Sequence, residues 1–452
     1  MPTQEVARAA PSALLQCEAL RRPVLLDGAG TDAWLRGETL YSDAPAATLE
    51  VFASGWGRWC SGAAERWRWG DPLAQWDAFL AGGRAEVGAR ADGAGFLTVL
   101  GYDLKHWIEQ LPRRHPWPRL PVLYCARYDW TYRADRHTGR AYIAAARDDL
   151  LADRVRRHER SGTTAKPRRP VVHACPRPAM RPDAYAAMIE RAQAYIAAGD
   201  VYEINLAQSF TAPGAREDAP ALFATWSERY PTPFSAYVDG GTWVVLSNSP
   251  ECFLHRDGDR VATYPIKGTR RRERGTPAAV LADALRADAK ERAEHVMVVD
   301  LERNDLGRVC EIGSVEVVEL AAVREYPLLV HMVSEVHGRL RPGISPGALL
   351  RATFPGGSIS GAPKVRALQL IEELEPAARG FYTGAIGWTE MDGSTRLNIA
   401  IRTAVLDADG DLTYWASGGI VADSDAQREY QESLLKAETF FRALASLNGR
   451  SG

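Results

Sequence analysis

The feature that most constrains the fold of this chain is the way its strand-like segments follow one another. Between residues 201 and 269, short runs of alternating apolar and polar residues are joined directly by turns, as in VYEINLAQSF, PFSAYVDG, TWVVLSNSP and CFLHRDGDRVATYPIKGT. The last third of the chain repeats this arrangement between residues 380 and 423. Strands connected as hairpins, without a helix after each strand, form antiparallel sheets. The sequence therefore predicts an α+β protein with antiparallel sheets.

A polar segment divides the chain into two predicted regions. Residues 1–165 contain short strand-like runs and few helical periods, so we expect a mostly-β region there. Within it, RVRRHERSGTTAKPRRP (residues 154–170) is basic and has no apolar period, which is typical of a linker. Residues 166–452 form the second predicted domain, whose first helix begins at Pro182 and ends near Gly199. Further helices are expected at residues 277–306, at residues 363–375 and from about residue 425.

The charge balance disfavours several kinds of partner. The 452 residues include 55 Lys and Arg and 57 Asp and Glu, which gives a formal net charge of -2. Such a chain has no overall field that attracts nucleic acid or an anionic membrane. The six cysteines are scattered and form no C-x-x-C pair, which argues against structural zinc and against a disulfide framework. No apolar run reaches the roughly 18 residues needed to span a bilayer. We therefore expect a soluble, cytoplasmic protein that binds neither nucleic acid nor membrane.

Two pairs of glutamates are spaced three residues apart in predicted helices, Glu291 with Glu294 and Glu429 with Glu432. This spacing places both members of a pair on one face of a helix. Two such faces could meet and provide oxygen ligands for Mg²⁺. A capping box formed by Asp288 and Glu291, together with exposed i,i+4 ion pairs, explains the same charges without a metal. The spacing alone leaves both interpretations open.

A glycine- and serine-rich segment, FPGGSISGAPKVRALQLIEELE (residues 354–375), leads into a predicted helix whose first turn holds Pro363. Free backbone amides at a helix start favour an anion. The segment differs from a P-loop because Ala362, Pro363 and Lys364 stand where that motif requires Lys followed by Ser or Thr. This difference disfavours a nucleoside triphosphate. The segment could still bind a carboxylate ligand, or it could be an ordinary glycine-rich start of a helix without a ligand.

Two side chains in apolar surroundings could take part in chemistry. Glu251 follows Ser249 and Pro250 and precedes an apolar run, where burial would raise its pKa and suit it to act as a general acid. His331 lies in an apolar strand-like run and could orient or polarise a substrate. An exposed glutamate in a turn and a hydrogen-bonded core histidine are the alternatives.

The motif PIKGT places Lys267 between Pro265 and Gly268, which we expect to form a turn. Three arginines follow at residues 270–272. An amine becomes a nucleophile when desolvation or nearby cations lower its pKa, and these arginines could supply the cations. The alternative is a solvated basic turn.

The order and the amino-acid sequences of these segments resemble those of the chorismate-utilising enzymes. The similar motifs span about residues 180–445 and are SPE, PIKGT, EHVMVVDLERNDLGRV, HMVSEVHG, FPGGSISGAPK, GFYTGAIG, LNIAIRTA and GGIVADSD. The resemblance implies a large two-lobed sandwich of antiparallel sheets flanked by helices. It also implies an N-terminal region similar to that of anthranilate synthase component I, and a catalytic domain that converts chorismate with Mg²⁺ as cofactor.

Within this family, the lysine in PIKGT is similar to that of component I of the aminodeoxychorismate synthases, whereas the anthranilate synthases have alanine there. The resemblance implies that Lys267 attacks C2 of chorismate while Glu251 protonates the departing C4 hydroxyl. Ammonia then attacks C4 and expels the lysine, giving 4-amino-4-deoxychorismate for p-aminobenzoate and folate biosynthesis. Anthranilate synthase component I is the alternative activity.

The resemblance also implies the other site residues. Isochorismate and salicylate synthases carry a general-base lysine in the strand that matches VYEINLAQSF, where this chain has Glu203 and the amine-transferring enzymes usually have glutamine. The implied Mg²⁺ ligands are Glu294 and Glu432, with Glu291 and Glu429 behind them. His331 and Ser358 match residues that line the ring, and Lys436 matches one near the metal. The positions that match carboxylate-binding residues are Tyr382, Arg402, Gly418 and Gly419.

The resemblance raises two further expectations about partners and regulation. No cysteine lies in a G-x-C-x-G elbow, so we expect ammonia to come from a separate glutamine amidotransferase (glutaminase) subunit. In related synthases the N-terminal sheet holds tryptophan near a Leu-Leu-Glu-Ser stretch. The partial match VLLDGAG makes Leu26 and Asp27 candidates for such a site.

Overall fold

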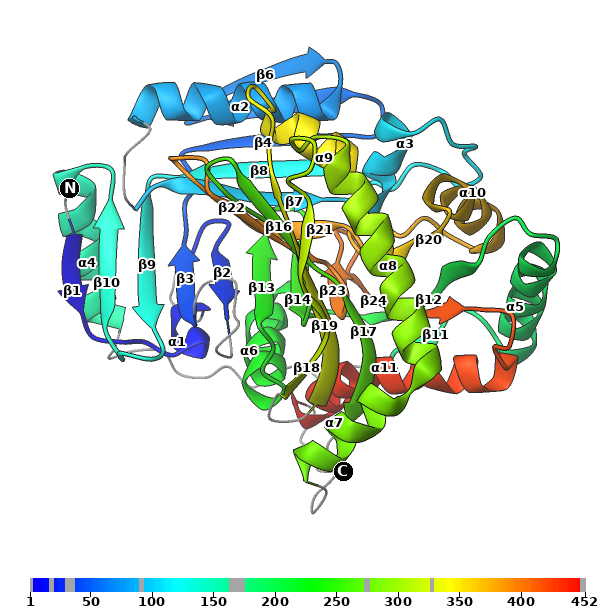
Figure 1. The fold of residues 1–452 in the computed structure, drawn as a ribbon. Coiled ribbons are helices and arrows are strands. Elements are labelled where there is room, and N and C mark those ends of the chain that lie inside the picture. The colour runs from blue at the N-terminus through cyan, green and yellow to red at the C-terminus, as the bar shows by residue number, and fades with distance from the viewer. Residues whose placement is uncertain are drawn as a thin grey trace.

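The chain forms two large sheets that pack against each other, with helices around them (Figure 1). The computed structural model describes residues 3–15, 20–28, 37–88, 93–161, 175–271, 277–325 and 329–447. Throughout these ranges, every pair of neighbouring strands is antiparallel. The α+β class and the antiparallel sheets predicted from the hairpin runs are confirmed.

The first sheet has twelve strands in the order β1, β10, β9, β3, β2, β13, β14, β23, β24, β12 and β11, with β20 also paired to β12. Its strands are β1 (Thr3–Val6), β2 (Val24–Asp27), β3 (Glu38–Ser42), β9 (Trp130–Asp135), β10 (Ala141–Ala145), β11 (Arg177–Pro178), β12 (Glu203–Pro213), β13 (Phe234–Asp239), β14 (Val244–Ser249), β20 (Gly361–Ala362), β23 (Thr403–Leu406) and β24 (Asp411–Ile420).

The second sheet also has twelve strands, in the order β17, β19, β16, β15, β22, β21, β7, β8, β4, β5 and β6, with β18 also paired to β19. Its strands are β4 (Ala47–Val51), β5 (Trp56–Ser61), β6 (Ala64–Trp69), β7 (Gly95–Leu100), β8 (Leu123–Tyr128), β15 (Cys252–Asp257), β16 (Arg260–Tyr264), β17 (Ile266–Arg271), β18 (Glu316–Glu325), β19 (Leu329–Arg339), β21 (Ala385–Glu390) and β22 (Thr395–Ile399).

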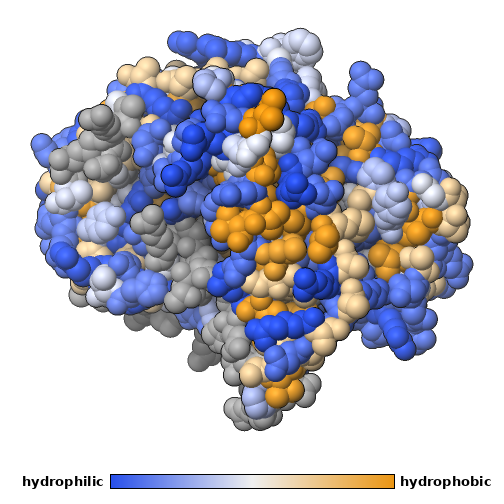
Figure 2. Space-filling model, viewed as in Figure 1, coloured by the Kyte–Doolittle hydropathy of each residue, from blue (hydrophilic) through white to orange (hydrophobic). Residues whose placement is uncertain are grey.

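The helices surround these sheets. They are α1 (Pro11–Leu15), α2 (Pro72–Val87), α3 (Lys105–Ile108), α4 (Asp148–Ser161), α5 (Pro182–Ala197), α6 (Ala219–Arg229), α7 (Ala278–Ala287), α8 (Ala289–Gly307), α9 (Pro346–Thr353), α10 (Lys364–Leu374) and α11 (Ala426–Leu447), with 3-10 turns at Tyr102–Leu104, Arg216–Asp218 and Gly357–Ile359. None of the helices in the described ranges is long and apolar enough to cross a bilayer. On the face seen in Figure 2, apolar side chains gather around α8, where the exposed residues include Val296, Val318 and Leu320.

A shared apolar core joins the two sheets. One buried cluster contains Leu26 and Val245 of the first sheet and Leu97 and Ile386 of the second. All four side chains are fully buried. Because a sheet of this size must bury an apolar face, this packing fixes the sandwich. The two-lobed sandwich that the family resemblance implies is therefore confirmed.

Both sheets contain strands from both predicted regions. In the first sheet β2 pairs with β13, and in the second β7 pairs with β21. The regions separated by the predicted boundary near residue 165 therefore share one pair of sheets. The boundary itself stays a prediction.

The chain passes between the sheets at several places, and two of these passages are neighbours. The first passage, at residues 250–251, connects β14 to β15, and the second, at residues 400–402, connects β22 to β23. Hydrogen bonds tie the two passages together: the Ser249 hydroxyl donates to the Ile399 carbonyl (2.6 Å), and the Ile399 amide donates to the Glu251 carbonyl (3.1 Å). The residues of both passages are thus held at the junction of the sheets.

Local predictions have mixed outcomes. The helix expected from Pro182 is α5, whose apolar residues are buried, and Gly199 follows it with φ +83°. The helix expected over residues 277–306 is divided at Asp288, which caps the N-terminus of α8. Helix α2 in the mostly-β region was not predicted.

The predicted linker is wrong where the structure describes it. Residues 154–161 belong to α4, since Val155 is 5% exposed and packs into the core beside the first sheet. The partly buried Leu150 and Leu151 anchor the same helix, but they precede the predicted linker, so no apolar period is visible within residues 154–170. The remainder of the linker, residues 162–170, lies outside the described residues.

Replacing Leu97 tests the shared core. Leu97→Ala should lower the free energy of unfolding by about 2 to 5 kcal/mol, because it removes a fully buried side chain between the sheets. Urea unfolding followed by tryptophan fluorescence measures this change. Leu320→Ala, at a position that is 46% exposed, is the matched control and should change the value by less than about 0.5 kcal/mol. Equal effects of the two substitutions would contradict the packing described above.

Candidate active site

A buried ion pair connects the two sheets. Lys267 lies on β17 of the second sheet, and its Nζ donates a hydrogen bond to Oε1 of Glu203 on β12 of the first sheet. The side chains are 13% and 2% exposed. Burial lowers the pKa of the Lys267 amine, but attraction to Glu203, with Glu294 and Glu251, raises it by more, so the net shift is upward. Lys267 is therefore a cation in the structure as described.

The surroundings of Lys267 differ from the sequence prediction in two ways. The expected turn is wrong: the segment is strand β17, with a register shift against β19 next to Gly268 (φ +68°). For Arg270 the expected role is also wrong, since its side chain binds Glu291 (2.9 Å) and Asp288 (2.8 Å). The side chains of the next two arginines lie outside the described residues. Carboxylates, rather than arginines, thus control the charge of Lys267.

Glu251 lies at the first passage between the sheets and is 3% exposed. Its Oε1 accepts hydrogen bonds from the Ser358 hydroxyl (2.7 Å) and from the Ile266 amide (3.4 Å). Burial raises the pKa of Glu251 to about 7, against the opposing effects of these hydrogen bonds and of Lys267. A carboxyl group that stays protonated near neutral pH can act as a general acid, so the sequence prediction of a raised pKa agrees with the structure.

Gly418 and Gly419 on β24 have different surroundings because neighbouring residues of a strand face opposite sides of the sheet. A Cβ on Gly419 would overlap Glu203 Oε1 and lie 3.3 Å from Lys267 Nζ. A Cβ on Gly418 would lie 3.0 Å from Oε2 of Glu429. The absence of a side chain at Gly419 therefore leaves the space that the buried ion pair occupies.

A chain of hydrogen bonds links Tyr382 to α11 through Ser417. The Tyr382 hydroxyl donates to Ser417 Oγ (2.7 Å), and Lys436 Nζ donates to the Ser417 carbonyl (2.8 Å). Lys436 also pairs with Glu432 (2.7 Å), the i,i+4 pair that the sequence predicts. Tyr382 is 2% exposed and its ring stacks on Trp415. These contacts bring Tyr382 and Lys436 to the same residue of β24.

Arg402 lies at the second passage, and its positive charge acts on His331. Arg402 has a left-handed backbone (φ +47°), a strained conformation for a residue with a Cβ, and its guanidinium makes no hydrogen bond or ion pair in the described chain. Burial, helped by the charge of Arg402, lowers the pKa of His331 to about 3, despite a hydrogen bond to the Gly268 backbone. Arg402 is thus a cation available to a carboxylate ligand, and His331 is neutral.

One glutamate of each pair, Glu294 and Glu432, lies in the electrostatic field of Lys267. Burial raises the pKa of Glu294 to about 7; the charges of Glu203 and Glu291 add to this shift, and Lys267 opposes it. Burial also raises the pKa of Glu429, and Glu432 adds to the shift. In contrast, the charge of Lys436 lowers the pKa of Glu432.

These carboxylates form an oxygen-rich region that suits a hard cation such as Mg²⁺. Hydrogen bonds hold Glu291 to Arg270, Glu429 to Ser424 (2.8 Å) and Glu432 to Lys436, while Glu294 makes none in the described ranges. No group of three His, Cys, Asp or Glu side chains in those ranges is arranged as a complete metal site. A divalent cation would nevertheless relieve the repulsion among the carboxylates, so the donor set fits Mg²⁺.

The glycine- and serine-rich segment supplies one site residue and is otherwise structural. Ser358 reaches Glu251, but Lys364 binds Asp305 and the carbonyls of Thr353 (3.2 Å) and Pro355 (2.8 Å). Lys364 is thus held inside the protein and is not available to a phosphate. Pro363 is the N-cap of α10 and does not lie in its first turn.

Leu26 and Asp27 lie on β2 in the first sheet. Leu26 is fully buried in the core between the sheets. Asp27 accepts a hydrogen bond from Thr39 (2.6 Å) and pairs with Arg136. No contact described here connects them with the residues around Lys267, and their role as a tryptophan site stays a prediction.

Sequence reasoning missed two residues of this region. Ser417 connects Tyr382 with Lys436, and Asn205 lies two residues after Glu203 on the same face of β12. The alternating pattern of VYEINLAQSF places positions 203 and 205 on one face of a strand, so Asn205 could have been inferred from its spacing.

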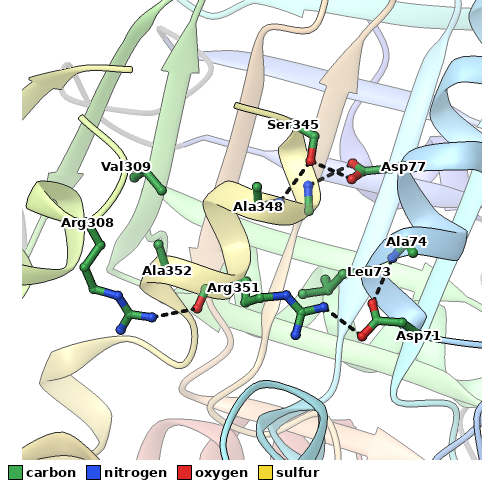
Figure 3. A pocket seen from close by; sticks show the side chains of 11 residues that line it. Asp71, Leu73, Ala74, Asp77, Arg308, Val309, Ser345, Ala348, Arg351 and Ala352 are labelled. Atoms are coloured by element: carbon green, nitrogen blue, oxygen red, sulfur yellow. Dashed lines mark hydrogen bonds and ion pairs between the residues drawn. The ribbon is translucent and has the colours of Figure 1, made fainter. Parts of the chain in front are cut away.

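A separate cavity of about 450 Å³ lies between α2 and α9 (Figure 3). None of the predicted site residues lines it. Its polar groups bind one another: Arg351 pairs with Asp71 (2.7 Å), and the Ser345 hydroxyl donates to Asp77 (2.7 Å). These pairs join a helix of the N-terminal region to one of the C-terminal region.

The comparison with protein families places this site in a known class. A model of the chorismate binding enzymes matches residues 37–442. The chain therefore belongs to the chorismate binding enzymes, and the family resemblance found in its motifs is confirmed. The match also extends well before residue 180, where the motif resemblance begins.

Relatives with different activities are similar to this chain. Aminodeoxychorismate synthase component 1 of Klebsiella aerogenes is 40% identical over 355 residues, which cover 78% of this chain and 77% of that protein. Anthranilate synthase component 1 1 of Haloarcula marismortui is 44% identical over 270 residues, which cover 59% and 55%. This chain thus spans about half the length of the Haloarcula relative.

Solved structures agree with the fold. Anthranilate synthase component I of Streptococcus pneumoniae has a TM-score of 0.77 and 28% identity, over 90% of this chain and 92% of that one. The isochorismate synthase MenF of Escherichia coli has a TM-score of 0.72 and 18% identity, over 98% and 94% of the two chains. The latter similarity shows the fold alone.

Adding a methyl group at Gly419 tests the geometry around the ion pair. Gly419→Ala should weaken chorismate binding about 10-fold, because the new Cβ displaces Glu203 or Lys267. Isothermal titration calorimetry with chorismate measures this loss. Gly82→Ala, on α2 where nothing lies within 4 Å of the added Cβ, is the control and should keep full affinity. Unchanged affinity in Gly419→Ala would contradict the geometry.

The buried carboxyl group of Glu251 should make stability depend on pH. Its pKa is about 7 in the fold and lies near the ordinary value of 4.5 in the unfolded chain. Its contribution to stability is therefore present at low pH and is lost as pH rises through about 7, by up to about 3 kcal/mol. Glu251→Gln should reduce the slope of unfolding free energy between about pH 4.5 and pH 7. The slope that remains comes from groups such as Glu302, whose pKa burial raises to about 8. An identical slope in both proteins would contradict the burial of Glu251.

Proposed function

We propose that this protein is component I of an aminodeoxychorismate synthase, which converts chorismate and ammonia to 4-amino-4-deoxychorismate. The observation that carries the proposal is the buried amine of Lys267, which lies in the electrostatic field of Glu251 and is hydrogen-bonded to Glu203. A buried amine and a protonated carboxyl group are the two groups that a displacement through a covalent lysine adduct requires.

The proposed reaction has two displacements. Lys267 first gives a proton to Glu203, and its lone pair forms a bond to C2 of chorismate. Both ring double bonds shift, the C4–O bond breaks, and Glu251 protonates the departing oxygen, which leaves as water. Ammonia then forms a bond to C4, both double bonds shift back, the C2–N bond breaks, and its electron pair returns to Lys267. The enolpyruvyl group stays on the product, so no pyruvate is released.

The other residues bind and orient the substrate in this proposal. Arg402 and Tyr382, with the backbone of Gly418 and Gly419, hold the substrate carboxylates, and an arginine fork suits that task. His331, which is neutral, and Ser358 line the ring, and Lys436 lies near the metal site. Glu294 and Glu432 would hold Mg²⁺, with Glu291 and Glu429 behind them. When bound, Mg²⁺ would neutralise the ring carboxylate of chorismate.

Ammonia would come from a separate glutamine amidotransferase subunit, and free ammonium should replace that subunit in vitro. The product would serve p-aminobenzoate and folate biosynthesis. Similarity to the aminodeoxychorismate synthase of Klebsiella aerogenes, over more than three quarters of each chain, supports this activity.

Anthranilate synthase component I is the second candidate. The similarity to the Haloarcula marismortui relative, at 44% identity, favours it. In that reaction ammonia adds at C2 and pyruvate is eliminated. Lys267 disfavours it, because a lysine that attacks C2 occupies the position where ammonia would have to bond.

The products distinguish the two activities. Purified protein with chorismate, Mg²⁺ and ammonium should yield an amino product that keeps its enolpyruvyl group, as measured by liquid chromatography with mass spectrometry. Lys267→Ala should lower its formation at least about 100-fold, since the covalent route needs the amine.

Two controls make this test specific. Lys290→Ala removes an exposed lysine that pairs with Asp423 and should keep most of the activity. Thermal unfolding of Lys267→Ala shows whether the variant folds. Anthranilate with an equal amount of pyruvate, or isochorismate or salicylate as the product, would overturn the proposal.

A further inference from the structure

Two buried oxygen atoms on the face of β12 that carries the ion pair have no hydrogen-bond partner in the described chain. They are Oε2 of Glu203, a residue that is 2% exposed, and Oδ1 of Asn205, which is 7% exposed. Leaving such groups without a donor costs about 1 to 3 kcal/mol each, and more for a charged group. Proteins therefore pair nearly all of them with a protein group, water or a ligand.

Strand register places both residues on the face of the first sheet that carries the ion pair. Asn205 lies directly opposite Gly419, and directly opposed residues of an antiparallel pair point to the same face. Glu203, two residues earlier on β12, points to that face too, and its Oε1 lies in the space above Gly419 together with Lys267 Nζ. Ser417, which binds Tyr382, shares the face. The two acceptors thus face the region that contains the predicted nucleophile and a predicted substrate-binding residue.

The chemistry of these two atoms selects the ligand. Both are hydrogen-bond acceptors, so they require a donor, and the carboxylate of Glu203, which pairs with Lys267, acts against an anion there. A substrate carboxylate is thus excluded from these two positions. Ammonia has three N–H groups, and two of them can bind the two acceptors while the lone pair stays available.

We propose that Glu203 Oε2 and Asn205 Oδ1 form the binding site of ammonia, the second substrate, next to Lys267. This inference rests on the proposed function. Ammonia held here lies beside the lysine that it must replace, so its lone pair can bond to C4 while the bond between C2 and Lys267 breaks. Glu203 then has two tasks, because one carboxylate oxygen holds Lys267 and the other holds the incoming nitrogen.

Steady-state kinetics at fixed pH, with ammonium chloride as the nitrogen source, tests this site. Asn205→Ala should raise the KM for ammonium about 10-fold, the effect of losing one hydrogen bond to a bound ligand. Its KM for chorismate should stay within about twofold of the wild-type value. Asn205→Asp keeps an acceptor oxygen at the same place and should restore most of the ammonium affinity.

Gln208→Ala is the matched control, since Gln208 is a buried amide on the same strand that faces away and binds Ser433 (2.7 Å). It should leave the KM for ammonium unchanged. Without ammonium, Asn205→Ala should still form the adduct of Lys267 with the dehydrated ring, detected by intact-protein mass spectrometry. This readout separates the first displacement from ammonia binding.

The outcomes separate the two proposals. An unchanged KM for ammonium in Asn205→Ala, or an equal rise in Gln208→Ala, would overturn the ammonia site while the activity stands. Loss of the adduct in Asn205→Ala would also overturn it, because the residue would then act on the first displacement. If wild-type protein gives no 4-amino-4-deoxychorismate, the proposed function fails, whatever the two variants do to ammonium binding.

Discussion

The ion pair between Lys267 and Glu203 is the interaction on which the rest of the site depends. It links the last strand of one sheet to β12, the last strand but one of the other, and both groups are almost completely buried. Removing one partner of such a pair leaves an uncompensated buried charge, which typically costs about 3 to 5 kcal/mol. The pair therefore fixes the direction of the Lys267 side chain, and Gly419 has to remain without a side chain to accommodate it.

Two neighbouring passages between the sheets determine which other groups surround this ion pair. Glu251 lies at the first passage and Arg402 at the second, and hydrogen bonds through Ile399 keep the passages adjacent. Residues at such junctions cannot satisfy the regular hydrogen-bond ladder of either sheet. Their polar groups are therefore available for other tasks, at the cost of local strain such as the left-handed conformation of Arg402. The site is thus formed by residues at the points where the chain crosses from one sheet to the other.

The sequence predicts those features that depend on neighbouring residues. The apolar spacing of α5, the cap at Asp288 and the hairpin runs are local patterns, and the structure agrees with them. The charge of Lys267 depends on Glu203, which is 64 residues away in sequence, so composition near PIKGT pointed to the wrong neighbours. The family motifs identified many of the residues that meet around Lys267. They could not indicate which carboxylate oxygens remain without partners, because that depends on side-chain geometry.

The interleaving of the two sheets has a consequence for how this protein reaches its folded state. Strand β7 pairs with β21, and β2 pairs with β13, so the ribosome releases early strands whose neighbours have not yet been synthesised. Contacts between residues so distant in sequence slow the search for the native topology. Until the last third emerges, the unpaired edges of early strands could join those of other nascent chains. Chaperones that shield nascent chains would therefore have most effect on this protein before residue 390 leaves the exit tunnel.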